Sequence, residues 1–340
     1  ETADELMDYL NTSKNIAISG SEQKRHLRNM GYYHGYKGYR YIRNSANRIP
    51  YTKFDELTAI YEFDSHLKAL FYPPAMRIET ALKNYVLESI IAIGKSDNFI
   101  DIYADLLDNY KQYQFSPSGS HNAKADQYKA ELKRRLDLRN RIYRVQTDSF
   151  CSGNPIAEHY LNKDINLPIW AIFELLSLGE FGRFVSCLNL HCRQDISRRL
   201  GIRQSDDTGA TLPQRLIYTL KDLRNAIAHD DVIFDVRFRT GKIDQQVGNA
   251  VSNHFSIPPL RFDTITDYLV LLVYLLSLLH FPVATGTHLI SSFSDEAEQL
   301  HSAVPTSVYH QILYTDQAAK LHALKPVSYT HLTLPTILLV

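Results

Sequence analysis

Residues 221–231 read KDLRNAIAHDD, and this stretch predicts an amphipathic helix with a polar side. At about 100° per residue, Asn225 and His229 lie one turn apart on that side, and Arg224 lies on its flank. We therefore expect a helix that offers a guanidinium, an amide and an imidazole to a partner. Its opposite side is apolar, because hydrophobic residues recur there at steps of four, three and four: Leu216, Leu220, Leu223 and Ile227.

Two acidic residues, Asp230 and Asp231, follow the last apolar position of this helix. The helix dipole favours cations at the carboxyl end, so acids there do not stabilise the helix. We therefore expect a local reason other than helix stability to hold these two residues in place.

The order of Arg, Asn, three small or apolar residues and His is similar to the R-x4-6-H motif of HEPN-domain ribonucleases. Spacing alone leaves a second interpretation open, that Arg224 and His229 are surface residues of a helix that packs only by its leucines. Further segments favour the first interpretation. Residues 224–238 (RNAIAHDDVIFDVRF) resemble the signature of Abi-like abortive-infection proteins of the AbiD/AbiF type, and so do residues 31–41, 57–93 and 167–184.

Helical periodicity dominates the chain and, with this resemblance, predicts an all-α fold: a HEPN-like helical bundle with a helical N-terminal extension. We also expect one short β-hairpin. Apolar residues alternate from Val232 to Phe238, residues 239–242 form a turn, and residues 243–247 return. The apolar run at 268–279 is shorter than the ~18 residues of a membrane span. It predicts a buried helix, and we expect no membrane partner.

The predicted organisation has four parts. An N-terminal helical part at 1–113 packs on the core, and a HEPN-like helical part at 127–325 carries the motif at 224–229. Between them, residues 114–126 (QFSPSGSHNAKAD) are polar and contain Ser, Pro and Gly, which is typical of a linker. Residues 326–340 have no helical period and resemble translated sequencing-adapter sequence, so we expect a non-native, unpacked tail.

The chain has 37 lysines and arginines and 37 acids, so its formal net charge is zero. An RNA-binding site must therefore be a local patch. The basic stretch at 132–144 can neutralise phosphates, or it can be a solvated face balanced by neighbouring acids. The tyrosines of 31–41 can stack on bases, or they can pack the N-terminal segment onto the core. The candidate RNA-binding residues are Arg77, which can instead pair with Glu79, and Lys133, Arg134, Arg135, Arg139, Tyr36 and Lys37.

The three cysteines, Cys151, Cys187 and Cys192, form no C-x-x-C pair. This argues against a disulfide framework and suits a reducing cytosol. The first residues are acidic and polar and show no signal peptide, so we expect a cytoplasmic protein. The spacing expected of a zinc site is also absent, and we expect no metal and no cofactor.

The motif residues suit the cleavage of RNA. RNA carries its own nucleophile, the 2′-hydroxyl beside the scissile phosphate, so no metal is needed to deliver water. His229 can move protons near neutral pH, Arg224 can bind phosphate oxygens, and Asn225 can orient His229 or the phosphate. We expect a metal-independent endoribonuclease that cuts single-stranded RNA to a 2′,3′-cyclic phosphate and a 5′-hydroxyl. DNA lacks the 2′-hydroxyl and should not be cut.

The resemblance adds expectations about assembly and biological role. HEPN ribonucleases usually build their site from two motif helices, which implies a homodimer. Abi-like proteins act in abortive infection or as toxins, which implies a small structured RNA or an antitoxin as a further partner. Two alternatives stay open. One is a non-catalytic RNA-binding regulatory protein that uses the same groove, and the other is an HD-type metal phosphohydrolase built on His229 and Asp230 with further ligands.

Overall fold

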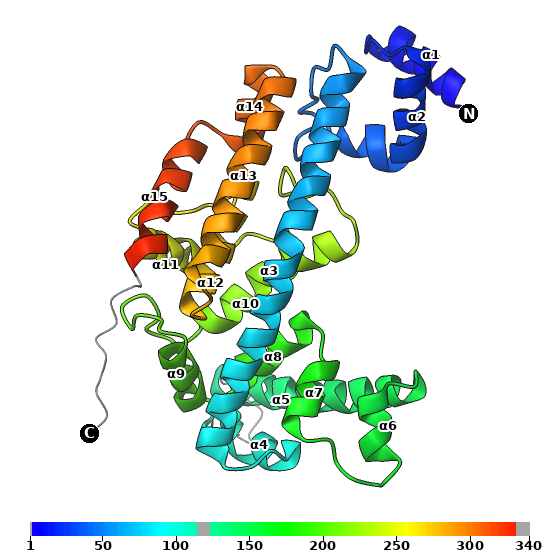
Figure 1. Cartoon of the computed structure of the whole chain (residues 1–340). Coiled ribbons are helices and arrows are strands. Elements are labelled where there is room, and N and C mark those ends of the chain that lie inside the picture. Colours follow the sequence, from blue (N-terminus) through cyan, green and yellow to red (C-terminus); the bar gives the residue numbers. More distant parts are fainter. Residues whose placement is uncertain (1, 114–122, 331–340) are drawn as a thin grey trace. The chain divides into compact units, whose positions relative to one another are not determined.

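The fold is given by a computed structural model that describes residues 2–113 and 123–330 (Figure 1). In these ranges the chain is mostly helical and forms no β-strand, and only isolated bridges occur, such as the one between Tyr41 and Arg48. The all-α prediction is confirmed at this level.

The chain divides into two compact units. Unit 1 is discontinuous and contains Glu1–Arg77 and Asp222–Val340, whereas unit 2 contains Ile78–Lys221. Two helices, α3 (Phe54–Gly94) and α10 (Leu212–Ala228), each begin in one unit and end in the other. The division therefore differs from the predicted one. Linker composition can indicate where one continuous part ends, but it does not reveal that two distant stretches of the chain form one unit.

Two predicted boundary segments lie partly outside the described residues. Residues 114–122 of the predicted linker are not among them, and residues 123–126 begin α5 (Ala123–Cys151). The predicted tail at 326–340 is helical in its first residues, because α15 (Gln317–Thr330) extends into it, and residues 331–340 lie outside the described ranges.

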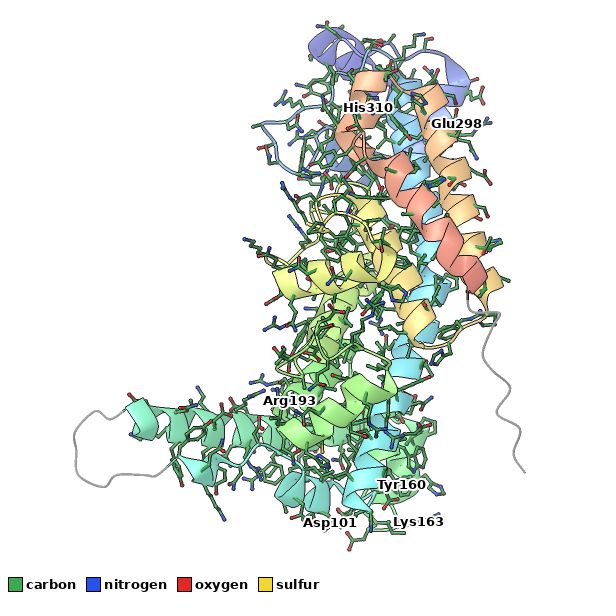
Figure 2. All side chains as sticks on the ribbon, turned by 90° about the vertical axis from the view of Figure 1, so that its left-hand side faces the viewer. Asp101, Tyr160, Lys163, Arg193, Glu298 and His310 are labelled. Carbon is green, nitrogen blue, oxygen red and sulfur yellow. The ribbon has the colours of Figure 1, made fainter. Side chains whose placement is uncertain are left out.

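Unit 1 is built around α12 (Ile265–Leu278), in which all but one of the 14 residues are buried. This confirms the buried helix predicted from the apolar run. Helix α12 packs against three other helices of the unit, and the Lys320 ammonium of α15 lies 2.7 Å from the Asp267 carboxylate of α12. The remaining elements of unit 1 are α1 (Ala3–Lys14), α2 (Gly20–Met30), the π-helical turn η1 (Gly31–Lys37), α11 (Gln245–Phe255), α13 (Val283–Ala303) and α14 (Thr306–Leu313). Figure 2 shows the side chains, with Glu298 of α13 and His310 of α14 labelled.

Helix α3 runs for 41 residues and contains Pro73 and Pro74, a pair that predicts an interruption. The structure keeps the helix continuous. Phe71 and Ala75, on either side of the pair, are fully buried, and the Phe71 ring stacks on Phe293 of α13 at 6.1 Å. Packing on both sides therefore outweighs the local cost of the prolines.

The predicted β-hairpin at 232–247 is wrong. Residues 232–244 form turns in the structure, and α11 begins at Gln245. Buried and exposed side chains do not alternate as they would in a strand at the surface, because four consecutive residues, from Ile233 to Val236, are all buried. Val236 also has a left-handed backbone with φ of 55°, which a strand does not contain.

Unit 2 packs short helices against α5. Its aromatic core places the Phe173 ring edge-on to Phe181 at 5.2 Å and to Phe184 at 5.0 Å. Arg193, labelled in Figure 2, lies 3.9 Å from the Asp108 carboxylate. Besides α5, the unit contains α4 (Phe99–Asp105), the short 3-10 turn η2 (Tyr110–Gln112), α6 (Pro155–Leu161), α7 (Ile169–Leu175), α8 (Leu178–Cys187) and α9 (Leu190–Arg199).

Among the residues that the structure describes, no helix combines the length and the apolar composition needed to cross a bilayer.

The three cysteines should differ sharply in reactivity. Cys151 is exposed, whereas Cys187 and Cys192 are buried, and burial raises the pKa of Cys187 and raises that of Cys192 to about 11. A raised pKa lowers the thiolate fraction at neutral pH. We expect a thiol reagent at pH 7.5 to modify one cysteine quickly in the native protein and all three after unfolding. Cys151→Ser should remove the fast phase, and a fast phase that persists in this variant would contradict the assignment.

Candidate functional site

The motif occupies the last turn of α10. The His229 amide donates to the Asn225 carbonyl at 2.9 Å, which completes the helical hydrogen bonds. Asp230 then adopts a left-handed backbone with φ of 56°, and its amide donates to Ile227 at 3.2 Å, while the Asp231 amide donates to Ala226 at 2.8 Å. This pair of bonds is the Schellman arrangement that ends a helix. His229 is thus the last residue before the chain turns away.

The burial pattern confirms the amphipathic helix. Leu216, Leu220 and Leu223 are fully buried. Arg224 and Asn225 are half-buried, and one guanidinium nitrogen of Arg224 donates to the Asn225 side-chain oxygen at 3.1 Å. The helix therefore holds Arg224 and Asn225 in contact with each other.

The imidazole of His229 is accessible. The residue is exposed and its side chain makes no hydrogen bond or ion pair with any residue that the structure describes. A groove of about 1070 Å³ opens elsewhere in unit 1, beside residues 239–245 and 258–263, and the motif residues do not line it. In a single chain His229 is therefore exposed at a helix end, apart from this groove.

A buried carboxylate that the sequence analysis missed fixes the segment after the motif. Asp64 of α3 is fully buried. One of its oxygens accepts from the amides of Ile233 at 2.8 Å and Phe234 at 2.6 Å, and the other accepts from the Tyr39 hydroxyl at 2.7 Å. The Asp64 side chain thus joins α3, the tyrosine-rich segment (residues 31–41) and the residues that follow the motif. The sequence does contain a sign of this residue: Asp64 is an acid next to the apolar Phe63, on the side of the predicted helix that is expected to be buried.

Lys68 joins Asp64 to the motif helix. Its ammonium lies 3.0 Å from the Asp64 carboxylate and 2.7 Å from that of Asp230, and its side chain is only 11% exposed. Asp230 therefore stands at the end of α10 because Lys68 binds it. This is the local reason, other than helix stability, that the sequence led us to expect for Asp230.

The environment shifts the pKa values of these groups. Burial raises the pKa of Asp64, and Lys68, the Tyr39 hydroxyl and the Ile233 amide oppose that shift by stabilising the carboxylate. Burial alone would lower the pKa of Lys68, but the carboxylates of Asp64 and Asp230 raise it above its usual value. Burial and Asp64 also raise the pKa of Tyr39 far above its ordinary range, so its hydroxyl stays a donor.

A second buried acid, Asp235, continues this attachment. Its carboxylate accepts two bonds from the Arg237 guanidinium, at 2.6 and 2.8 Å, and one from the Arg43 amide. Arg237 in turn donates to the carbonyls of Gly38 at 2.8 Å and Tyr41 at 2.7 Å. The residues that follow the motif are therefore bonded along their length to residues 38–43.

In the tyrosine-rich segment, the two predicted RNA-binding residues, Tyr36 and Lys37, both pack against tyrosine rings. Tyr36 is only 5% exposed and stacks on Tyr32 at 5.7 Å, so its ring is a packing group. Lys37 is half-buried, with its ammonium 4.2 Å from the ring centre of Tyr33. Tyr33, which was not among the predicted residues, is the exposed member of this group.

Arg77 is exposed on α3. It follows Lys68 by nine residues, or two and a half turns, so it leaves α3 on the opposite side. The structure does not bring Arg77 to the same side as the Lys68–Asp230 contact.

The predicted basic residues of α5 lie in unit 2, apart from the motif residues of unit 1 in the division of the chain. Arg135 is buried and donates to the Asp108 carbonyl at 3.0 Å and the Tyr103 carbonyl at 2.5 Å, so it holds the fold of unit 2. Arg134 donates to the Ser186 carbonyl. Lys133 and Arg139 are exposed, and the Arg139 guanidinium lies 5.8 Å from the Tyr103 ring centre.

The metal alternative gains no support from the described residues. Asp230, its proposed ligand beside His229, is bound to Lys68. Among the residues that the structure describes, no group of three or more His, Cys, Asp or Glu side chains is placed to hold a metal ion.

Comparison with known proteins identifies the family. The family model of the Abi-like proteins matches residues 25–235, which is more than half of the chain, and the chain therefore belongs to that family. This membership supports a role in abortive infection. Neither the curated proteins nor the solved structures give a significant match.

Asp64 should matter for stability far more than its exposed neighbours. In Asp64→Asn the Lys68 ammonium loses the buried one of its two carboxylate partners and keeps only the exposed Asp230, and the Tyr39 hydroxyl loses a charged acceptor. We expect the free energy of unfolding, measured by denaturant titration, to fall by about 3 kcal/mol.

Asp231→Asn is the matched control, because Asp231 follows the same helix and is exposed. Its effect should stay within about 0.5 kcal/mol. The double variant Asp64→Asn with Lys68→Met should recover part of the loss, because it removes the charge that has lost its buried partner. Equal, small effects of Asp64→Asn and Asp231→Asn would contradict the role of Asp64.

Proposed function

We propose that this protein is a metal-independent endoribonuclease of an abortive-infection or toxin–antitoxin system. It cleaves single-stranded RNA through Arg224, Asn225 and His229. The observation that carries the proposal is an exposed imidazole that bonds to none of the described residues and lies one turn beyond an amide that contacts a guanidinium. Membership in the Abi-like family supports the biological setting.

The reaction is a transesterification within the RNA. The 2′-oxygen attacks the adjacent phosphorus, the new 2′-O–P bond forms, and the bond from phosphorus to the 5′-oxygen breaks. One imidazole takes the proton of the 2′-hydroxyl, and another gives a proton to the leaving 5′-oxygen. The products are a 2′,3′-cyclic phosphate and a 5′-hydroxyl, and no water is consumed in this step.

In this proposal Arg224 binds the scissile phosphate and Asn225 orients the Arg224 guanidinium. The planar Arg224 guanidinium can donate to two phosphate oxygens and stabilise the charge that develops in the transition state. Asn225 holds the guanidinium from one side through the 3.1 Å bond, so this donor is oriented before RNA arrives. Histidine is the side chain that most often acts as base or acid near neutral pH.

A second copy of the chain completes the site in this proposal. One chain supplies one His229, whereas the reaction uses both a base and an acid. The motif of a single chain lies on an open helix end, so a two-fold partner can face it and close a cleft around the RNA. The same assembly would place two arginines around one phosphate.

The cellular setting follows from this chemistry. We place the protein in the cytoplasm, where RNA is available and where free cysteines stay reduced. An antitoxin or a small structured RNA would keep the nuclease silent until infection.

Substitution of the motif residues tests the proposal directly. We expect Arg224→Ala and His229→Ala to lower the rate of cleavage of labelled single-stranded RNA by about 10²- to 10⁴-fold, with EDTA present throughout. His288→Ala is a matched control, because His288 is also an exposed histidine of unit 1. This variant should cut like the wild type, and single-stranded DNA of the same sequence should stay intact.

Three results would contradict the proposal. Equal cleavage by the wild type and both motif variants would place the activity elsewhere, and loss of cleavage in EDTA would indicate a metal. Tight, salt-sensitive RNA binding without any product, unchanged by His229→Ala, would favour the non-catalytic RNA-binding regulator instead.

A further inference from the structure

The N-terminal part of unit 1 contains a basic segment, residues 14–48, although the chain as a whole is neutral. Residues 14–48 contain eight lysines and arginines and a single acid, Glu22. Arg25, Arg28 and Arg48 are exposed and form no ion pair with any residue that the structure describes. Lys24 pairs with Asp4 of α1 at 2.6 Å, and the segment still keeps an excess of positive charge.

Three tyrosine rings pack together beside this segment, and two lysine ammonium groups lie over them. The Tyr32 ring stacks on Tyr36 at 5.7 Å and meets the Tyr9 ring edge-on at 6.4 Å. The Lys14 ammonium lies 5.0 Å from the Tyr9 ring centre, and the Lys37 ammonium lies 5.1 Å from that of Tyr32. Helices α1 and α2 and the turn η1 pack together to hold these side chains, and α1 and α2 lie side by side in Figure 1.

Tyr33 is the exposed ring of this group. Its side chain is 73% exposed, whereas Tyr36, three residues later, is 5% exposed. The Lys37 ammonium lies 4.2 Å from the Tyr33 ring centre and leaves the rest of the ring to solvent. An exposed aromatic ring next to a cation is the combination that stacks on an unpaired base while the cation meets its phosphate.

The backbone holds Tyr33 in a defined place. Residues Gly31–Lys37 form a π-helical turn, a rare conformation that occurs often at functional sites. Gly31 starts the turn with φ of 71°, and a Cβ at Gly35 would lie 2.7 Å from Met30, so the turn packs closely on the end of α2. The exposed ring is therefore presented by a tightly packed turn.

We propose that this tyrosine and lysine patch, defined by Tyr9, Lys14, Tyr32, Tyr33, Lys37 and Arg40, is a binding site for unpaired nucleotides of RNA. The Tyr33 ring stacks on a base, and Lys14, Lys37 and Arg40 contact the phosphates on either side. The rings of Tyr9 and Tyr32 hold the ammonium groups of Lys14 and Lys37 in place. The choice of RNA over DNA rests on the proposed function, because neither stacking nor phosphate contacts require a 2′-hydroxyl.

Charge around the tyrosines agrees with this assignment. Lys14 and Arg40 both lower the pKa of Tyr9, for which the hydrogen bond from Lys14 is the largest cause. Burial is the main reason that the pKa of Tyr36 is raised, and Lys14, Arg40 and Arg48 oppose it. Lys14 and Arg40 thus act electrostatically on both tyrosines, and Arg48 acts on Tyr36.

Binding is measured by fluorescence anisotropy with a labelled 12-nucleotide oligouridylate. The full chain carries His229→Ala throughout, so that cleavage does not consume the probe. Against this parent, Tyr33→Ala should weaken binding by about tenfold or more, because stacking on one base is lost. Tyr33→Phe keeps the ring and should bind like the parent. Tyr72→Ala is the control, because Tyr72 is an exposed tyrosine of unit 1 outside the patch.

The contribution of Lys14 and Lys37 is tested separately, by the salt dependence of binding. Lys14→Gln with Lys37→Gln should reduce the slope of log Kd against log salt by about 1.4, since each phosphate contact on a single strand contributes about 0.7. Lys242→Gln removes an exposed lysine elsewhere in unit 1 and should leave the slope unchanged. Thermal unfolding of each variant reports that the fold is kept.

Several outcomes would overturn the inference. These are unchanged binding in folded Tyr33→Ala, equal binding of a duplex RNA of the same length, or full competition by polyglutamate at equal charge, which would indicate an acidic protein partner. Failure of the two proposals is distinguishable. Cleavage without an effect of Tyr33 leaves the nuclease standing, and Tyr33-dependent binding by a wild type that cuts no RNA leaves the binding site standing.

Discussion

The structure of the motif region depends on one buried carboxylate. Asp64 lies in the interior of unit 1 with no surface exposed to solvent, so its charge must be balanced by donors within the protein. The donors come from three places in the sequence: Tyr39 before α3, Lys68 one turn along α3, and the amides of Ile233 and Phe234 after the motif helix. A charge that cannot be left unpaired therefore determines where the chain goes after His229.

This constraint also connects the parts of the chain that define the family. The family match, residues 25–235, begins before Tyr39 and ends just beyond the amides that Asp64 binds. Tyr39 stacks on Phe234 at 5.7 Å, so the same two segments meet through rings as well as through the carboxylate. Lys68 extends the contact to Asp230 at the end of α10. The tyrosine-rich segment and the motif segment thus form one structural element around α3, with Arg224 and His229 at its edge.

Much of the motif could be predicted from the sequence, because helical periodicity is local. The buried leucines of α10 and the almost completely buried α12 follow from the positions of apolar residues in the sequence alone. The hairpin was predicted from alternation after the motif and is wrong, since Asp64 and Arg237 bind that segment as a series of turns. Hydrogen bonds between residues far apart in the chain produce no periodic pattern in the sequence. Arg135 of α5 is a similar case, because its guanidinium donates to the carbonyls of Asp108 and Tyr103, and composition does not reveal such bonds.

The central claim is that a fixed helix end presents Arg224 and His229 to RNA, whose own 2′-hydroxyl is the nucleophile. The ends of the RNA fragments test this claim most directly. After digestion by the wild-type protein in EDTA, we predict that every upstream fragment carries a 2′,3′-cyclic phosphate and every downstream fragment a 5′-hydroxyl. Fragments that end in a 3′-hydroxyl and begin with a 5′-phosphate would show that water attacked the phosphorus, and they would contradict the account.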